Sequence, residues 1–327
     1  MPLTAPNYGQ VVRLLFSSLL AACCLLGLAA SANGGSEYRE RLIFREVGLD
    51  GHKRLLSRHD ISPYTSSLSP DYKEFAYIAQ QCVGCPGNPV MVADVRSPRE
   101  RVLVESRTWY GVSWAPNGRQ LALNGGTDVQ SGLWLVNADG SDLHHVANTG
   151  HLTWSPDSKS LASSRPISVL SLETGQERYL SQGYGPAWSP DGTRIAFTHN
   201  SVIDVASVRT GDVRRLARGV GPSWSPDGRR IAFIRYMRDA YHISLWVIST
   251  RGGKPRRIAR GLSPGAPLIW SPKGRQIAFN RGDGLFAKRP DGDRARLLAR
   301  ENRAIVPLAW SRDGRRVLYS ALIRSNE

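Results

Sequence analysis

A segment of about eleven residues occurs seven times in this chain of 327 residues, and this repetition constrains the fold more than any other feature. Two clear copies, residues 187–197 and 223–233, read AWSPDGTRIAF and SWSPDGRRIAF. Successive copies lie about 40 residues apart, which is the period of a four-stranded propeller blade. The second position of each copy, called the anchor here, is occupied by Leu68, Trp114, Trp154, Trp188, Trp224, Trp270 and Trp310.

Each copy contains the residue types of a β-hairpin. The tryptophan ends a first strand and offers a large apolar surface to a neighbouring sheet. Pro-Asp-Gly then forms a tight turn, because proline fixes φ, aspartate bonds to nearby backbone and glycine adopts the left-handed conformation. A buried second strand such as residues 231–233 follows, and segments such as 245–248 and 256–259 supply the third and fourth strands. The sequence therefore predicts an all-β protein built from four-stranded blades.

The two ends of the repeat region complement each other. After Trp310 only two strands remain, and they end near Leu322. Residues 41–47 and 53–57 have the pattern of a third and a fourth strand that lack the first two. Joined, the termini complete one composite blade, which leaves no free strand edge. We predict a seven-bladed β-propeller over residues 38–322, with six internal blades and one composite blade.

The repeated Trp-Ser-Pro-Asp-Gly resembles the WD40-like Pro-Asp repeat of TolB-type β-propellers, and the resemblance extends from about residue 40 to 322. It implies a propeller without one particular function, because the family has many. TolB itself carries an α/β domain ahead of six blades, whereas this chain has seven repeats, so the resemblance is to the family and not to TolB. Peptidases of the prolyl oligopeptidase type add an α/β-hydrolase domain, and no segment here is left for one.

Residues 1–32 resemble an export leader, because residues 14–32 are apolar and uncharged and follow a single arginine. Three outcomes are open. Ala30-Ser31-Ala32 suits cleavage by signal peptidase, Leu20-Ala21-Ala22-Cys23 resembles a lipobox that would lipidate Cys23, and the apolar stretch is long enough to remain as a membrane anchor. Each outcome predicts a periplasmic or extracellular location, or attachment to the outer side of a membrane through the leader alone.

Cys82 and Cys85 are the only cysteines beyond the leader. A thioredoxin-type site would need a helix after the first cysteine, but residues 86–89, Pro-Gly-Asn-Pro, are typical of a loop. A zinc site would need a second pair of ligands, and there is no other CxxC. We therefore expect a Cys82–Cys85 disulfide on a surface loop, and no metal or other cofactor.

The formal charge of +16 comes from 43 Lys and Arg against 27 Asp and Glu. A hydrophobic fraction of 41% allows a sizeable core and excludes a disordered polyelectrolyte, and the composition also excludes a multi-span membrane protein. The excess charge either reflects arginine-rich coding or marks an anionic partner. Export argues against nucleic acid, so the predicted partner is a protein or an anionic polymer of the cell envelope.

No motif for catalysis meets its structural requirements. Residues 261–265 match GxSxG, but they lie between two expected strands and include Pro264. His144 and His145 point to opposite faces of a strand, so they cannot easily share a metal ion with His151. The first strands, such as 184–188 and 305–310, contain few titratable residues. We predict no catalytic residue and no metal site.

The candidate binding residues lie where fourth strands end. Arginine recurs there, and a long connection between a second and a third strand adds further polar side chains. Alternatively, these arginines only solvate strand ends. We expect an exported, non-catalytic scaffold; the alternative is a propeller lyase or hydrolase acting on an anionic saccharide through the central channel. The candidate residues are Arg58, Arg107, Arg218, Arg260 and Arg300 at strand ends, and Tyr236, Arg238, Tyr241 and His242 in the connection.

Overall fold

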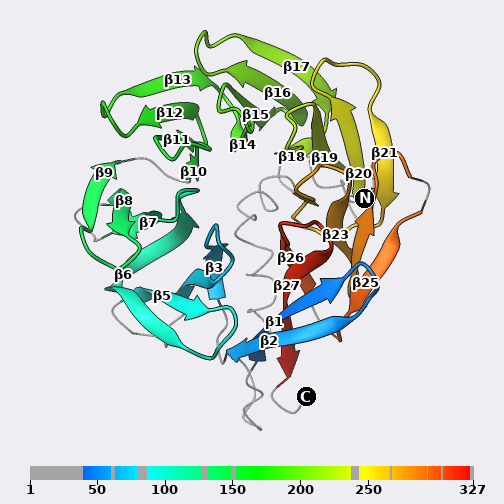
Figure 1. Cartoon of the computed structure of the whole chain (residues 1–327). Coiled ribbons are helices and arrows are strands. Elements are labelled where there is room, and N and C mark those ends of the chain that lie inside the picture. The colour runs from blue at the N-terminus through cyan, green and yellow to red at the C-terminus, as the bar shows by residue number, and fades with distance from the viewer. Residues whose placement is uncertain are drawn as a thin grey trace, which may run out of the picture.

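The computed structural model is a closed ring of seven four-stranded antiparallel blades (Figure 1). It describes residues 40–59, 63–79, 87–126, 131–148, 152–236, 243–265, 267–292, 294–302 and 305–324. The predicted all-β class and the seven-bladed propeller are confirmed. No helix in this part of the chain is long and apolar enough to span a membrane.

Four blades are separate sheets of consecutive strands, each with the anchor strand first in the sheet order. Blade 3 contains β10 (Leu152–Trp154), β11 (Ser160–Ser163), β12 (Ile167–Ser171) and β13 (Glu177–Ser181). Blade 4 contains β14 (Tyr184–Trp188), β15 (Arg194–His199), β16 (Val202–Ser207) and β17 (Val213–Arg218). Blade 5 contains β18 (Val220–Trp224), β19 (Arg230–Tyr236), β20 (Ile243–Ser249) and β21 (Arg256–Arg260). Blade 6 contains β22 (Ile269–Trp270), β23 (Ile277–Arg281), β24 (Gly284–Lys288) and β25 (Arg296–Arg300).

Blades 1 and 2 share one long strand, β6 (Glu100–Trp114). Its first part pairs with β5 as far as Arg107, and its second part pairs with β7 from Thr108 onward. The strand is therefore outermost in blade 1 and innermost in blade 2. The other strands of the two blades are β3 (Pro63–Leu68), β4 (Glu74–Ala79), β5 (Asn88–Asp94), β7 (Gln120–Gly126), β8 (Ser131–Asn137) and β9 (His144–Ala147).

The two ends of the described chain form the composite blade, in the order β2-β1-β27-β26. Its strands are β1 (Glu40–Gly48), β2 (Lys53–His59), β26 (Ile305–Trp310) and β27 (Arg316–Arg324). β1 pairs with β27 without interruption from Glu40 opposite Arg324 to Gly48 opposite Arg316. This confirms the prediction that residues near both termini complete one blade.

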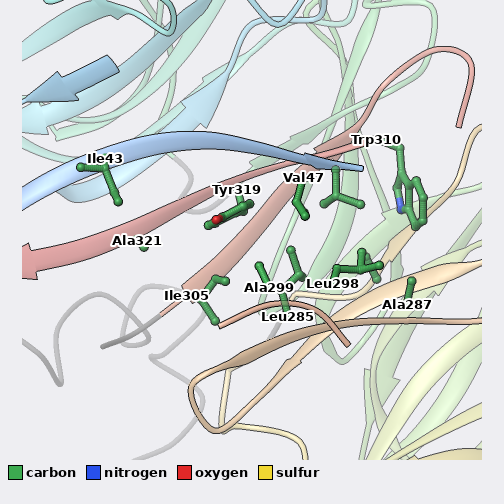
Figure 2. Close-up of a cluster of buried hydrophobic side chains, with 12 residues drawn as sticks. Ile43, Val47, Leu285, Ala287, Leu298, Ala299, Ile305, Trp310, Tyr319 and Ala321 are labelled. Atoms are coloured by element: carbon green, nitrogen blue, oxygen red, sulfur yellow. The ribbon is translucent and has the colours of Figure 1, made fainter. Parts of the chain in front are cut away.

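The seam between blade 6 and the composite blade shows how neighbouring sheets pack. Ile43 and Val47 of β1 and Tyr319 of β27 lie in one buried cluster with Leu285 of β24 and Leu298 of β25 (Figure 2). The cluster joins segments about 250 residues apart in sequence, so closure of the ring buries apolar surface as an ordinary core does.

The anchor tryptophans serve as interblade plates, as predicted, and also donate a hydrogen bond that the sequence did not predict. In five seams the indole Nε1 donates to the carbonyl of the residue that precedes the anchor of the previous blade. For Trp224 the acceptor is the carbonyl of Ala187, at 2.9 Å. The other four bonds are Trp154 to Ser113 at 3.1 Å, Trp188 to Thr153 at 2.9 Å, Trp270 to Ser223 at 3.1 Å and Trp310 to Ile269 at 3.1 Å.

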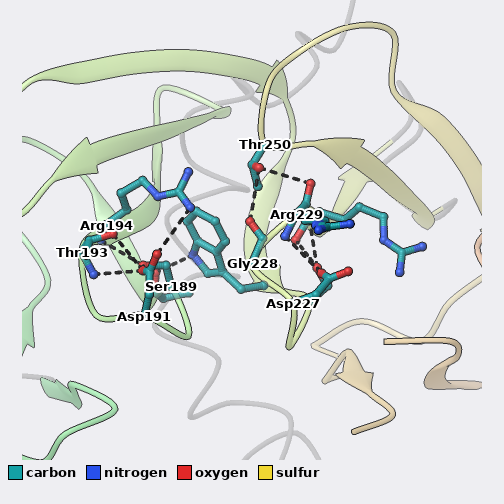
Figure 3. Close-up of polar contacts among 12 residues, drawn as sticks. Ser189, Asp191, Thr193, Arg194, Asp227, Gly228, Arg229 and Thr250 are labelled. Carbon is teal, nitrogen blue, oxygen red and sulfur yellow. Dashed lines mark hydrogen bonds and ion pairs between the residues drawn. The ribbon is translucent and has the colours of Figure 1, made fainter. Parts of the chain in front are cut away.

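The Pro-Asp-Gly turns repeat one set of polar contacts (Figure 3). The Ser189 hydroxyl donates to the Asp191 carboxylate at 2.5 Å, and that carboxylate also accepts from the Thr193 amide at 3.0 Å. The Thr250 amide, in the turn between third and fourth strands, donates to the Arg229 carbonyl at 2.9 Å. Both kinds of turn therefore lie on one side of the ring, which we call the turn face.

Candidate functional site

The structure places the five predicted arginines at equivalent positions on the circumference. Each of these arginines lies at or next to the last residue of the outermost strand of its blade; for Arg107 this is the first part of β6. These strands lie on the outside of the ring and not around the central channel (Figure 1). Arg58, Arg218, Arg260 and Arg300 are exposed, and the side chain of Arg107 lies outside the described set. The paired residues are Ile43 for Arg58, Asn88 for Arg107, Val202 for Arg218, Ser244 for Arg260 and Gly284 for Arg300.

The outermost strands of four adjacent blades carry basic residues and no acidic ones. These are β17, β21, β25 and β2, in blades 4, 5, 6 and the composite blade. On the other three blades the outermost segments are balanced or uncharged, for example Glu177 beside Arg178 in β13. We call the basic set the basic arc; all its members are exposed. They are Lys53, Arg54, Arg58, Arg214, Arg215, Arg218, Arg256, Arg257, Arg260, Arg296 and Arg300.

Sequence reasoning found only the strand-end members of the arc. The others could have been found from the paired basic residues at or near the start of β2, β17 and β21, and from Arg296 at the start of β25. Their grouping on adjacent blades becomes visible only when the ring is closed, because β2 and β25 are far apart in sequence.

Several members of the arc hold neighbouring blades together. Arg214 donates to the carbonyl of Arg251 at 3.2 Å and to that of Thr250. Arg256 donates to the carbonyl of Asp291 at 3.4 Å, and Lys53 donates to that of Arg300 at 2.7 Å. These contacts are structural, since each crosses a seam.

Three strand-end arginines differ from those members. Within the described residues, no carboxylate lies within 4 Å of Arg58, Arg218 or Arg260, whereas Arg300 has Asp283 at 3.8 Å. The Arg218 carbonyl accepts from Arg235 at 2.7 Å, and burial together with the Arg218 charge lowers the pKa of Arg235. The three strand-end guanidinium groups are thus exposed without a carboxylate partner among the described residues, so they are available to an external anion.

The other predicted site residues are only partly described. Tyr236 is half-buried against the apolar cluster of blades 5 and 6, and burial raises the pKa of its hydroxyl. Residues 237–242, which include Arg238, Tyr241 and His242, lie outside the described residues, as do Cys23, Cys82 and Cys85. The predicted disulfide and lipidation site therefore stay predictions.

One cluster has the order of a Ser-His-acid triad. His59 Nε2 lies 3.1 Å from the Ser57 hydroxyl, and His59 Nδ1 lies 2.7 Å from Glu100. However, Ser57 is only 6% exposed and donates its proton to the Val95 carbonyl at 2.8 Å. The cluster thus joins the composite blade to blade 1 and presents no free nucleophile. Among the described residues, no three His, Cys, Asp or Glu side chains gather as metal ligands do.

A cleft of about 330 Å³ opens between the composite blade and blade 1. Ala309, Arg312 and Arg316 line it from the composite blade, and Tyr72 and Arg96 line it from blade 1. Glu46, on its wall, receives a hydrogen bond from Arg316 at 3.0 Å. No sequence pattern predicts this cleft, because its walls come from two blades.

These features define the class of the protein as a seven-bladed β-propeller with TolB-like Pro-Asp repeats. No family model matches the sequence. An uncharacterized protein of Agrobacterium fabrum is 23% identical over 192 residues, which cover 49% of this chain and 62% of that relative. The chain thus spans about three fifths of the length of this curated relative.

Two solved structures resemble the ring. A proposed TolB from Agrobacterium tumefaciens superposes with a TM-score of 0.53 at 17% identity, covering 88% of this chain and 99% of the other. An oligogalacturonate lyase in complex with manganese superposes with a TM-score of 0.60 at 11% identity, covering 87% of this chain and 91% of the lyase. At these identities the likeness shows the fold alone, and the same fold occurs in a proposed TolB and in a lyase.

Proposed function

We propose that this protein is an exported, non-catalytic scaffold whose basic arc binds an acidic protein or an anionic polymer of the cell envelope. The observation that carries the proposal is the set of exposed basic residues on four adjacent outermost strands that contain no acidic residue. Guanidinium groups can bind carboxylate, sulfate and phosphate bidentately. Several such groups on one side of a rigid ring produce a field that steers an acidic partner.

The resemblance to TolB-like propellers supports a binding role, and the leader-like residues 1–32 support export. The arc lies on the circumference, so a partner can extend over several blades without entering the channel. Contacts of this kind weaken with added salt, because exposed charges are screened over about 10 Å at 0.1 M.

A lyase acting on an anionic saccharide is the second candidate, and the TM-score of 0.60 to the oligogalacturonate lyase favours it. Incubation with oligogalacturonate and manganese tests this candidate. A lyase would produce an unsaturated sugar that absorbs in the ultraviolet. Binding of the saccharide without such a product is the result expected of a scaffold.

The scaffold is tested by binding to polygalacturonate and to a glutamate-rich peptide. The variant Arg58→Gln, Arg218→Gln, Arg260→Gln removes three charges from the arc. We expect binding at low salt to weaken several-fold and its salt dependence to become shallower, with an almost unchanged Tm, because exposed charges contribute little to stability.

A matched control removes the same charge from the turn face. Arg119, Arg229 and Arg275 are exposed at equivalent positions of three Pro-Asp-Gly turns or their variants. The variant Arg119→Gln, Arg229→Gln, Arg275→Gln should bind almost as the parent does. Equal weakening in the two triple variants would mean that net charge alone attracts the polymers, and the proposed role of the arc would be wrong.

A further inference from the structure

The seam between the composite blade and blade 1 departs from the repeat at three positions that meet in space. The anchor is Leu68 where the other copies have tryptophan, Tyr72 occupies the turn position held by glycine in most copies, and Arg312 replaces the turn proline. Tyr72 keeps the left-handed backbone of that glycine, with φ of 62°. Tyr72 and Arg312 both line the 330 Å³ cleft.

The same surface receives an indole at the other seams. In five seams the backbone carbonyl of the residue before one anchor accepts a hydrogen bond from the anchor tryptophan of the next blade, as the Ala187 carbonyl does from Trp224. The equivalent carbonyl at this seam belongs to Ala309, a residue of the cleft wall. Leu68 has no N–H to donate to it. The cleft therefore offers an acceptor at the place where the repeat binds an indole N–H.

A cation stands at the matching place above the cleft. Arg194 and Arg230, six residues after their anchors, lie 4.9 and 5.1 Å from the ring centres of Trp224 and Trp270 in the next blade. Arg316 is the equivalent residue of the composite blade. Its side chain is 49% exposed, compared with 34% for Arg194 and 27% for Arg230. Its guanidinium donates to Glu46 at 3.0 Å and has no tryptophan of the next blade beneath it.

None of the tryptophans in these 327 residues supplies the missing indole. All nine tryptophans lie in strands of the ring, and none belongs to a segment outside the described residues. A second copy has the same tryptophans committed to its own blades. A cleft of about 330 Å³ is at the small end of ligand sites and suits one large side chain.

We propose that this cleft binds a tryptophan side chain of a partner polypeptide. The indole N–H donates to the Ala309 carbonyl, and the ring lies between the Arg316 guanidinium and the Tyr72 side of the cleft. The charged groups around the cleft, among them Arg96 and Arg312, lie where the backbone and neighbouring residues of a partner would pass. A ligand indole in this cleft would make the hydrogen bond that five other seams make with their own tryptophan. The site is independent of the basic arc.

Titration with the peptide Gly-Gly-Trp-Gly-Gly, followed by NMR, tests the proposal directly. The parent protein should bind it at least tenfold more tightly than Gly-Gly-Phe-Gly-Gly. Methylation of the indole nitrogen should weaken binding roughly three- to tenfold, which corresponds to one hydrogen bond. Free tryptophan should bind more weakly than the peptide; equal affinity would identify a small molecule as the ligand and overturn the assignment to a polypeptide.

Two variants locate the site. Leu68→Trp combined with Tyr72→Gly restores the repeat, so it should abolish peptide binding and raise the Tm. If that variant does not fold, Arg316→Gln serves instead; it should weaken binding several-fold, whereas Arg275→Gln should not. The triple variant of the basic arc should bind the peptide as the parent does, which separates this site from the proposed function. Absence of binding to the parent at millimolar peptide, or equal binding by the repeat-restoring variant, would overturn the proposal.

Discussion

Glu301 connects blade 6 to the composite blade, and its substitution should weaken closure of the ring. Its side chain is 7% exposed and accepts from Arg45 at 2.6 Å and from the Tyr319 hydroxyl at 2.6 Å, with Lys53 at 3.3 Å. Arg45 and Tyr319 lie in β1 and β27, on the two chain ends that meet in this blade. The change Glu301→Gln keeps the shape of the side chain and removes its charge.

The expected cost follows from these contacts. Hydrogen bonds to a charged group contribute about 1.5–3 kcal/mol each and neutral ones about 0.5–1.5 kcal/mol. In the variant, the neutral glutamine amide would replace the carboxylate as the partner of Arg45 and Tyr319. Breaking a buried ion pair costs about 3–5 kcal/mol. We expect Glu301→Gln to lower the free energy of unfolding by about 3 kcal/mol, which for a chain of this size lowers the Tm by about 5–10 °C.

The effect should depend on pH in a defined direction. Burial alone would raise the pKa of Glu301, but hydrogen bonds from Tyr319 and Arg45 outweigh it and hold the pKa below its ordinary value. A carboxylate with a lowered pKa in the folded state stabilises above its unfolded pKa, about 4.3, and this stabilisation is lost as pH falls through the folded pKa. The difference between parent and Glu301→Gln should therefore be full at pH 7 and shrink below about pH 4.

Thermal and urea unfolding at pH 7 and pH 3.5 measure this difference. Asp283→Asn is the control, because Asp283 pairs with Arg300 at 3.8 Å while both side chains are more than half exposed. Its loss should cost less than about 0.5 kcal/mol. A Glu301→Gln variant that melts within 1–2 °C of the parent (roughly 0.5 kcal/mol), or a control that loses as much, would refute the reasoning.

Three further predictions concern the rest of the ring. Deletion of residues 38–58 should expose the edge of β27 and cause aggregation, and a soluble deletion protein with a cooperative melt would contradict the role of the composite blade. The exported protein should gain two mass units on reduction if Cys82 and Cys85 form a disulfide, and an unchanged mass would show free thiols. Hydrogen bonds from Ser155 and the Lys159 amide lower the pKa of Asp157, so Asp157→Asn should cost about 1 kcal/mol at pH 7 and almost nothing below pH 3, as acid-unfolding curves would show.

The fold was accessible from the sequence because its period, turn residues and terminal half-blades each have a local cause. Pairing of β1 with β27 followed from counting strands, without knowledge of any contact between them. The indole hydrogen bonds were not accessible, because they join residues about 40 apart through a backbone carbonyl that carries no sequence signal. The cleft and the grouping of the arc on adjacent blades were missed for a related reason, since each depends on blades that become neighbours only when the ring closes.

On both sides of the composite blade, polar contacts replace the close glycine packing seen at two other seams. At these two other seams a glycine, Gly183 or Gly219, lies between a fourth strand and the next anchor strand, and a Cβ there would collide with Phe197 or Phe233 of the next blade. On one side of the composite blade, Glu301 takes the place of the glycine and Tyr319 that of the phenylalanine, and the two are hydrogen-bonded. On the other side, His59 and Tyr77 take these places, and both contact Glu100.

The chain itself makes consecutive blades neighbours, so among the described strands the one pairing between distant segments is that of β1 with β27. Glu301, a buried acid between β25 and β26, favours this pairing because it contacts Arg45 of β1 and Tyr319 of β27 together, and its charge would lose both partners without it. His59, buried between Ser57 and Glu100, joins β2 to blade 1 by a similar polar contact. Polar contacts on both sides of the composite blade thus favour closure in one arrangement, with β1 beside β27 and blade 1 following β2.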